Sequence, residues 1–285
     1  MAGIGMNIYL QLTETFNRER LRAIICSGQA VVLHRLAIMS KDGDWILRED
    51  DEALSHVLSV LDSCGARYRF GAPLDVRWMA GGWSAHFEFR QDNLRVRTDF
   101  FTRPSRIPET KLPQLWQEQA DQTIPFVNIR DLADMKKTNR ERDYAVIGEL
   151  ARLMIAAEDQ MLYSRSARDL IRLGAQHPVL IEQLSVQRPL LEIVSEGREQ
   201  LEAALDAERR SLIHANEDRR AAYRRAAVNW AALWPQVASE REASDRQRYP
   251  IRASDGRADR RRAVLINIRD DEDYKAERAY RCAAN

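Results

Sequence analysis

The sequence predicts an α+β protein in which a mixed β-sheet with flanking helices is followed by a mostly helical C-terminal region. Two observations lead to this prediction. The first part of the chain contains short apolar or alternating segments separated by turn residues, the pattern of strands. Beyond about residue 155 the chain is rich in Ala, Arg, Glu and Leu, with apolar residues at helical spacing. We therefore expect a domain at residues 1–155 and a helical region at 156–285, with a polar linker near 239–262.

The strands and helices follow from local patterns taken in order. Alternating or β-branched runs bounded by Gly, Asp and Asn predict strands at residues 23–26, 42–47, 67–70, 74–79, 84–89, 94–101 and 125–129. Hairpin turns are expected at Gly81-Gly82 and at Gln91-Asp92-Asn93. Apolar stripes, acidic first turns and terminal glycines predict helices at residues 13–22, 28–36, 50–65, 130–137 and 140–150, and a long one within 193–234. A short strand-like run occupies residues 263–268.

The composition is that of an ordinary soluble protein and gives no global bias toward nucleic acid or membrane. The 285 residues carry a formal net charge of +1, and 31% of them are charged. No apolar run is long enough to span a bilayer, and the first residues lack the basic region and apolar core of a secretory signal. The three cysteines have no metal-ligand spacing, which fits a reducing compartment. We therefore expect a cytoplasmic protein with no membrane partner.

The triplet Asp42-Gly43-Asp44 opens one of the expected strands. Residues two apart on a strand project from the same face, so the two carboxylates are expected side by side. Like charges this close repel each other unless a cation lies between them, and Mg²⁺ is typically held by one or two carboxylates plus substrate phosphates. Asp and Gly are also common turn residues, and the triplet alone favours a polar turn.

Three further features extend this pattern. Asp99 lies near the end of a later strand, either as a catalytic acid or as an exposed residue paired with Arg97 or Arg103. Ser27-Gly28 precedes a helix whose N-terminus would offer free N–H groups to an anion. Lys136 and Lys137 close another helix, where a lysine either favours the helix dipole or reaches a nucleotide phosphate.

Taken together, these motifs resemble the nucleotidyltransferase superfamily of polymerase-beta type over about residues 5–155. More narrowly, the chain is similar to small bacterial AbiEii-toxin-like proteins and their uncharacterised relatives. The resemblance implies a metal-binding and catalytic triad formed by Asp42, Asp44 and Asp99. It implies nucleotide binding by Ser27 and Gly28, by Lys136 or Lys137, and by Arg140, with Asp143 in the same distal motif.

The resemblance also implies a function. A nucleoside monophosphate would pass from an NTP to an RNA, protein or small-molecule acceptor, with Mg²⁺ or Mn²⁺ as cofactor, in a toxin–antitoxin or phage-defence setting. The chain departs from the pattern at three positions: Ser27 where a glycine is common, Ile38 where a basic residue is common, and Gly43 between the carboxylates. These departures favour an alternative, a nucleotidyltransferase-like binding module without transfer activity.

Overall fold

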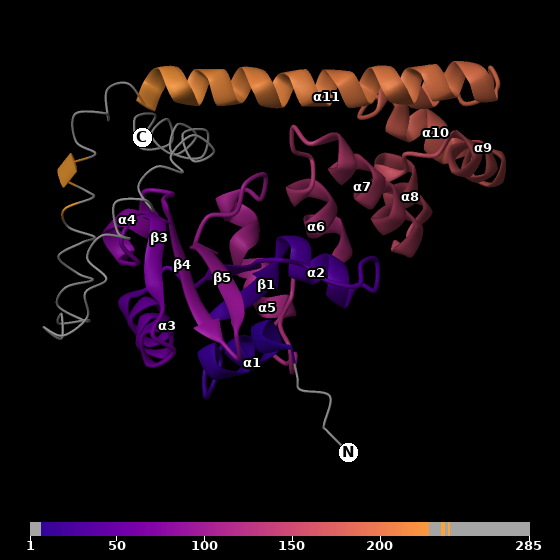
Figure 1. Ribbon diagram of the computed structural model, residues 1–285. Helices are drawn as coiled ribbons and strands as arrows, with labels where there is room; N and C mark the ends of the chain where they lie inside the picture. The colour runs from indigo at the N-terminus through magenta and orange to yellow at the C-terminus, as the bar shows by residue number, and fades with distance from the viewer. Residues whose placement is uncertain (1–6, 228–234, 237–238, 240–285) are drawn as a thin grey trace, which may run out of the picture.

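A five-stranded mixed sheet forms the centre of the molecule in the computed structural model, which describes residues 7–227, 235, 236 and 239 (Figure 1). Its strands are β1 (Ala23–Cys26), β2 (Gly43–Leu47), β3 (Arg67–Gly71), β4 (Ser84–Gln91) and β5 (Leu94–Phe101). Their order is β1-β2-β5-β4-β3. The β2–β5 pair is parallel, and the other neighbouring pairs are antiparallel. The predicted mixed sheet is therefore confirmed.

Helices flank this sheet before and after its last strand. They are α1 (Ile8–Phe16), α2 (Ser27–Leu33), α3 (Asp51–Ser63), α4 (Val76–Ala80), the 3₁₀ turn η1 (Glu109–Lys111), α5 (Leu112–Glu118), α6 (Ile129–Met135) and α7 (Glu141–Leu153). Their ends follow local chemistry. The Asp50 carboxylate accepts a hydrogen bond from the Ala53 N–H and so begins α3, and Gly65, at φ +66°, follows its end.

Aromatic side chains fill the core on one face of the sheet. Trp45 stacks on Phe100 from the neighbouring strand, with ring centroids 5.3 Å apart, and Phe16 of α1 meets both rings edge-on. The Trp45 indole N–H donates to Thr13 Oγ1 at 2.9 Å, so its one polar group is satisfied inside the core. Because strand residues alternate between faces, burying Trp45 and Phe100 here sends the residues before them to the opposite face.

A helical region follows, as the sequence predicts. It comprises α8 (Ala157–Tyr163), α9 (Ala167–Gln176), α10 (Pro178–Ser185), the 3₁₀ turn η2 (Pro189–Ile193) and α11 (Arg198–Ala227). Met161, Leu170, Leu191 and Leu201 form part of a second hydrophobic core there. In Figure 1, α11 runs along the top of the molecule, and its residues Leu212 and Ile213 pack against the first core. The long helix therefore contacts both cores.

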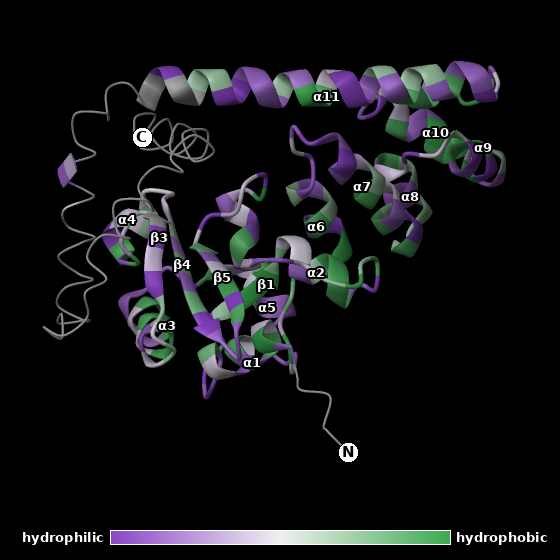
Figure 2. Cartoon of the chain, viewed as in Figure 1, coloured by the Kyte–Doolittle hydropathy of each residue, from purple (hydrophilic) through white to green (hydrophobic). Residues whose placement is uncertain are grey.

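Hydrophilic residues cover most of α11 (Figure 2). This distribution explains why the longest helix is still no candidate for a membrane span. Among the described residues, none of the helices is both long enough and apolar enough to cross a bilayer.

Several sequence-based boundaries are wrong. Residues 74–79 do not form a strand, because the Asp75 carboxylate accepts from the Arg77 N–H and starts α4 instead. The first helix ends at Phe16 and does not span 13–22. The strand expected at 125–129 shrinks to one parallel bridge between Ile25 and Phe126. The linker, apart from residue 239, and the strand-like run at 263–268 lie outside the described residues.

Candidate functional site

Two carboxylates lie side by side at the centre of the sheet. Asp44 on β2 and Asp99 on β5 are directly paired in the parallel register. Cys26 is the partner of Asp44 on β1, and His86 is the partner of Asp99 on β4, so the four residues form one row across the sheet. The row lies on the face opposite Trp45 and Phe100. The sheet register therefore brings together two acids that are 55 residues apart in the sequence.

The surroundings of Asp44 disfavour the ionised form of its carboxyl group. Burial and the negative charges of Asp99 and Asp42 raise its pKa to about 7, although Lys136 and a hydrogen bond from the Ser27 side chain act in the opposite direction. A buried carboxyl group that resists ionisation, in part because other carboxylates surround it, gains stability when a cation arrives. This is the electrostatic signature expected of a cation-binding acid.

Asp99 stands in a different environment. Its Oδ1 lies 2.8 Å from His86 Nδ1 and 3.5 Å from an Arg69 guanidinium nitrogen. Burial alone would raise the pKa of Asp99, but the charges of His86, Arg69 and Arg97 outweigh burial and hold that pKa below its ordinary value. His86 in turn shares a 2.6 Å hydrogen bond with the buried Ser84 hydroxyl. Asp99 is thus the ionised member of the carboxylate pair.

Neither arginine considered from the sequence is the close partner of Asp99. Arg97 instead lies 3.7 Å from Asp42 Oδ1, and Arg103 pairs with Glu49 at the other end of β2. The partners actually used, His86 and Arg69, come from β4 and β3, and no spacing in the sequence indicates that these strands adjoin Asp99.

The acid set has the chemistry of a site for a hard divalent cation. Asp42 Oδ1 and Asp99 Oδ1 are buried oxygens without an aligned hydrogen-bond donor among the described residues. Carboxylate oxygens of this kind are ligands that Mg²⁺ and Mn²⁺ accept. Within residues 7–227, however, no three His, Cys, Asp or Glu side chains are already gathered closely enough to hold a metal. The acids share one region of the sheet without forming a closed coordination sphere.

Ser27 and Gly28 connect β1 to α2 beside these acids. Ser27 has φ +54°, a left-handed conformation unusual for a residue with a side chain, and its side chain hydrogen-bonds to Asp44. A Cβ at Gly28 would lie 2.2 Å from Ser40 Oγ, so a larger residue there would force the Ser40 side chain to rotate. The Gln29 amide donates to the carbonyls of Ser40 and Asp42 at 3.2 and 3.3 Å, which ties the segment before β2 to α2. Gln29 is a positioning residue that the sequence pattern did not reveal.

Steric packing explains why residue 43 is a glycine. A Cβ at this position would lie 2.3 Å from the Trp45 ring and 2.5 Å from the Tyr9 ring. The glycine between Asp42 and Asp44 is therefore a consequence of core packing, since the two aromatic rings occupy the space of a side chain.

The two lysines at the end of α6 point to different partners. Lys136 is buried, its Nζ lies 3.8 Å from Asp143 Oδ1, and its charge lowers the pKa of Asp44. Lys137 instead pairs with Asp134 at 2.7 Å and lies over the Tyr163 ring at 4.5 Å. Of the two lysines, Lys136 is therefore the one that faces the carboxylates.

Asp143 organises the loop between α6 and α7. Its buried carboxylate accepts hydrogen bonds from the Thr138 hydroxyl at 2.6 Å and from Arg140 Nε at 2.9 Å. Arg140 uses one edge of its guanidinium for this contact, and its side chain is half exposed. Asp143 thus holds Lys136 and Arg140 on one short segment.

The long helix α11 reaches the same loop through Asn216. The Asn216 amide donates to the carbonyls of Lys137 and Thr138 at 3.2 and 3.1 Å. Its oxygen accepts from Arg106 and Arg219. Asn216 lies 79 residues from Lys137 in the sequence, so only the tertiary structure reveals this contact.

Comparison with known proteins adds little to this geometry. No family model matches the chain, and no curated protein matches it significantly. The solved structures that resemble it include the crystal structure of a "putative nucleotidyltransferase" from H. pylori, at 13% sequence identity and a TM-score of 0.37. That alignment covers 74% of this chain and 96% of the other. At this level of similarity the functional argument depends on the residues of the chain itself.

Proposed function

We propose that the chain is a metal-dependent nucleotidyltransferase, which moves a nucleoside monophosphate from an NTP to a hydroxyl group of an RNA, protein or small-molecule acceptor. The observation that supports this most is the pairing of Asp44 with Asp99 on adjacent parallel strands, with the charge of Lys136 acting on Asp44. An acid pair for a cation and a buried ammonium for phosphates are the parts that phosphoryl chemistry needs.

The acids have distinct roles in this proposal. Asp42 and Asp44, together with Asp99, would hold Mg²⁺ or Mn²⁺. When bound, the metal would neutralise phosphate charge and lower the pKa of the acceptor hydroxyl. Asp99 is ionised beside His86 and Arg69, and it accepts the proton that the hydroxyl loses.

The remaining residues bind the triphosphate. The Gly28 N–H and the Ser27 hydroxyl, which gives up its hydrogen bond to Asp44, hold the β- and γ-phosphates, and Lys136 neutralises the charge that develops on the leaving group. The acceptor oxygen forms a bond to the α-phosphorus, the α–β bond breaks, and pyrophosphate leaves. Asp143 keeps Lys136 and Arg140 in place, because its carboxylate lies 3.8 Å from Lys136 Nζ and accepts a hydrogen bond from Arg140 Nε.

A second function, nucleotide binding without transfer, is favoured by one specific observation. Asp99 is already in contact with His86 and Arg69, and Asp42 has Arg97 3.7 Å away. Cationic groups next to two of the three acids compete with a metal for the same oxygens. If they are not displaced, the chain binds a nucleotide or a partner and transfers nothing.

Incubating the protein with each α-³²P-labelled NTP, with Mg²⁺ or Mn²⁺ and with total RNA and protein, separates the two functions. Transfer predicts label on an acceptor, a loss of at least about 100-fold in Asp44→Asn, and no loss in Asp121→Asn, whose exposed carboxylate serves as the control. NTP binding without labelling would support the binding module. Absence of both labelling and NTP binding would refute the proposed function.

We further propose, from the sequence resemblance, that the protein acts in the cytoplasm in a toxin–antitoxin or phage-defence setting. Induced expression should then arrest growth, and Asp44→Asn should not. Equal growth of cells expressing either form would remove the toxin setting and leave the transfer reaction to be judged by the labelling experiment.

A further inference from the structure

A cavity of about 620 Å³ opens beyond the carboxyl ends of the parallel strands β2 and β5. Leu47, Arg48, Thr102, Arg103, Leu112 and Trp116 are among its lining residues. Asp44 lies near the opposite, amino end of β2, so this cavity is separate from the carboxylate row. Its volume is in the range of sites that bind small molecules, and the carboxyl ends of parallel strands are a common place for them.

Two acids, Glu49 and Glu109, also line this cavity, and both are bound by Arg103. The segment that follows β2 carries several carboxylates, and three of them are bound by arginines from elsewhere in the chain. These pairs are Glu49 with Arg103 at 2.8 Å, Asp50 with Arg20 at 2.6 Å, and Glu52 with Arg22 at 2.6 Å. Arg103 also reaches Glu109 at 2.6 Å, so the second arginine in the cavity wall is fully paired.

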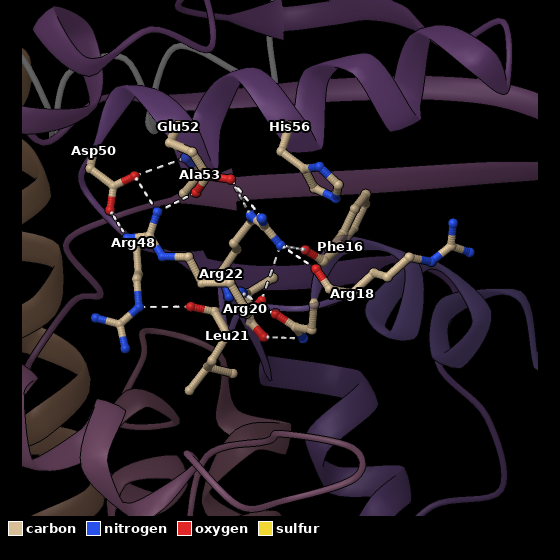
Figure 3. A network of polar contacts seen from close by, with 12 residues as sticks. Phe16, Arg18, Arg20, Leu21, Arg22, Arg48, Asp50, Glu52, Ala53 and His56 are labelled. Atoms are coloured by element: carbon tan, nitrogen blue, oxygen red, sulfur yellow. Dashed lines mark hydrogen bonds and ion pairs between the residues drawn. The ribbon is translucent and has the colours of Figure 1, made fainter.

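Arg48 is different, because it is held in place without a carboxylate. Its Nε donates to the Leu21 carbonyl at 2.7 Å, and its guanidinium lies 4.4 Å from the centre of the Trp116 ring. Figure 3 shows this single bond to Leu21, with the two outer nitrogens directed away from the neighbouring arginine–carboxylate pairs. Among the residues that the structure describes, no acceptor is bonded to those outer nitrogens.

The electrostatics agree with this geometry. Burial and the nearby charge of Arg20 both lower the pKa of Arg48, and Asp50 offsets them only in part. The cation is therefore less stabilised than an arginine in water, and an incoming anion would restore that stabilisation. A guanidinium fixed by a hydrogen bond and by an adjacent indole ring is pre-oriented to bind two oxygens of a carboxylate or phosphate.

We propose that this cavity is a binding site for a small organic anion, a carboxylate or phosphate group carried on an apolar or aromatic body. The outer nitrogens of Arg48 bind the anion. The body packs on the apolar wall formed by Leu47, Leu112 and Pro113. The site accepts one anionic group, since Arg103, the other cation in its wall, is committed to Glu49 and Glu109.

Three probes test the site in the full-length protein: benzoate, phenyl phosphate and the neutral benzyl alcohol. Probes of this size bind proteins with affinities on the order of millimolar, which NMR titration measures. In the wild type, at least one anion should shift the Trp116 indole N–H resonance, assigned with Trp116→Phe, and benzyl alcohol should not. Tighter binding of benzoate identifies a carboxylate ligand, and tighter binding of phenyl phosphate identifies a phosphate ligand.

Substitutions then locate the anion. Arg48→Met should weaken anion binding by at least about tenfold, because it removes a charged hydrogen-bond donor. Arg198→Met, which removes an exposed arginine on α11, should bind like the wild type. The proposal is overturned if neither anion moves the Trp116 resonance in the wild type, or if a folded Arg48→Met binds as tightly as the wild type. The wild-type titration decides the question even if Arg48→Met fails to fold.

Discussion

Replacing Asp44 by Asn tests the central claim about the carboxylate row, because it removes the charge and keeps the shape. The pKa of Asp44 is about 7 in the folded protein and 3.8 for an ordinary Asp. The difference of about 3 pH units, at 1.36 kcal/mol each, corresponds to a cost of about 4 kcal/mol for keeping this carboxylate ionised in the folded state.

The sign of the effect follows from the two pKa values. Below pH 3.8 the carboxyl is protonated in both states and contributes nothing. Between pH 3.8 and about 7 the unfolded state releases the proton first, so the free energy of unfolding falls as the pH rises. Above pH 7 the full cost is present. Asn carries no charge, so Asp44→Asn should match the wild type near pH 4 and exceed it by about 4 kcal/mol at pH 8.

Thermal melts from pH 4 to 8 in the presence of EDTA measure this difference. For a domain of this size the gain corresponds to a rise in Tm of about 10 °C at pH 8. Asp121→Asn, which neutralises an exposed acid, should show no such trend. Adding Mg²⁺ and NTP should raise the wild-type Tm and leave Asp44→Asn unmoved. If Asp44→Asn melts below the wild type at every pH, Asp44 is a structural hydrogen-bond acceptor and the reasoning is wrong.

Three further predictions concern residues around the site. Lys136→Met should weaken NTP binding by about tenfold in calorimetry, whereas Lys137→Met should not, because Lys136 acts on Asp44 while Lys137 pairs with Asp134. Gly43→Ala should lower the free energy of unfolding by about 1–3 kcal/mol in urea titrations, because the new methyl group meets two core rings. Asn216→Asp keeps an acceptor for two arginines but loses the donor to the loop at 137–138, so amide exchange in that loop should accelerate.

Three results would contradict these predictions. Equal NTP affinities of Lys136→Met and Lys137→Met would show that Lys136 is not the lysine that contacts the phosphates. A Gly43→Ala protein as stable as the wild type would mean that the Trp45 and Tyr9 rings can move aside. For Asn216, unchanged exchange in both Asn216→Asp and Asn216→Ala would show that α11 does not hold the loop.

Where local pattern and packing agreed, the sequence was sufficient. The strand from Leu94 to Phe101 was predicted with its observed ends, because alternation and the Asp92-Asn93 turn both mark it. The strand predicted at residues 74–79 is wrong, because there the apolar pattern and the local hydrogen bonding disagree. Their apolar residues fit a strand, but the Asp75 side chain begins a helix, and one hydrogen bond decides between the two.

The sequence by itself determined the α+β class and the helical second part, and it named the acids as candidates, since these depend on periodicity and residue type within short windows. Only the tertiary structure decided which acids meet and what surrounds them. The β2–β5 register pairs Asp44 with Asp99, and β4 and β3 bring His86 and Arg69 to Asp99. Helix α11 adds Asn216 to the loop after α6. Such contacts join residues tens of positions apart, and chain folding, unlike local propensity, sets the distances and burial that shift a pKa.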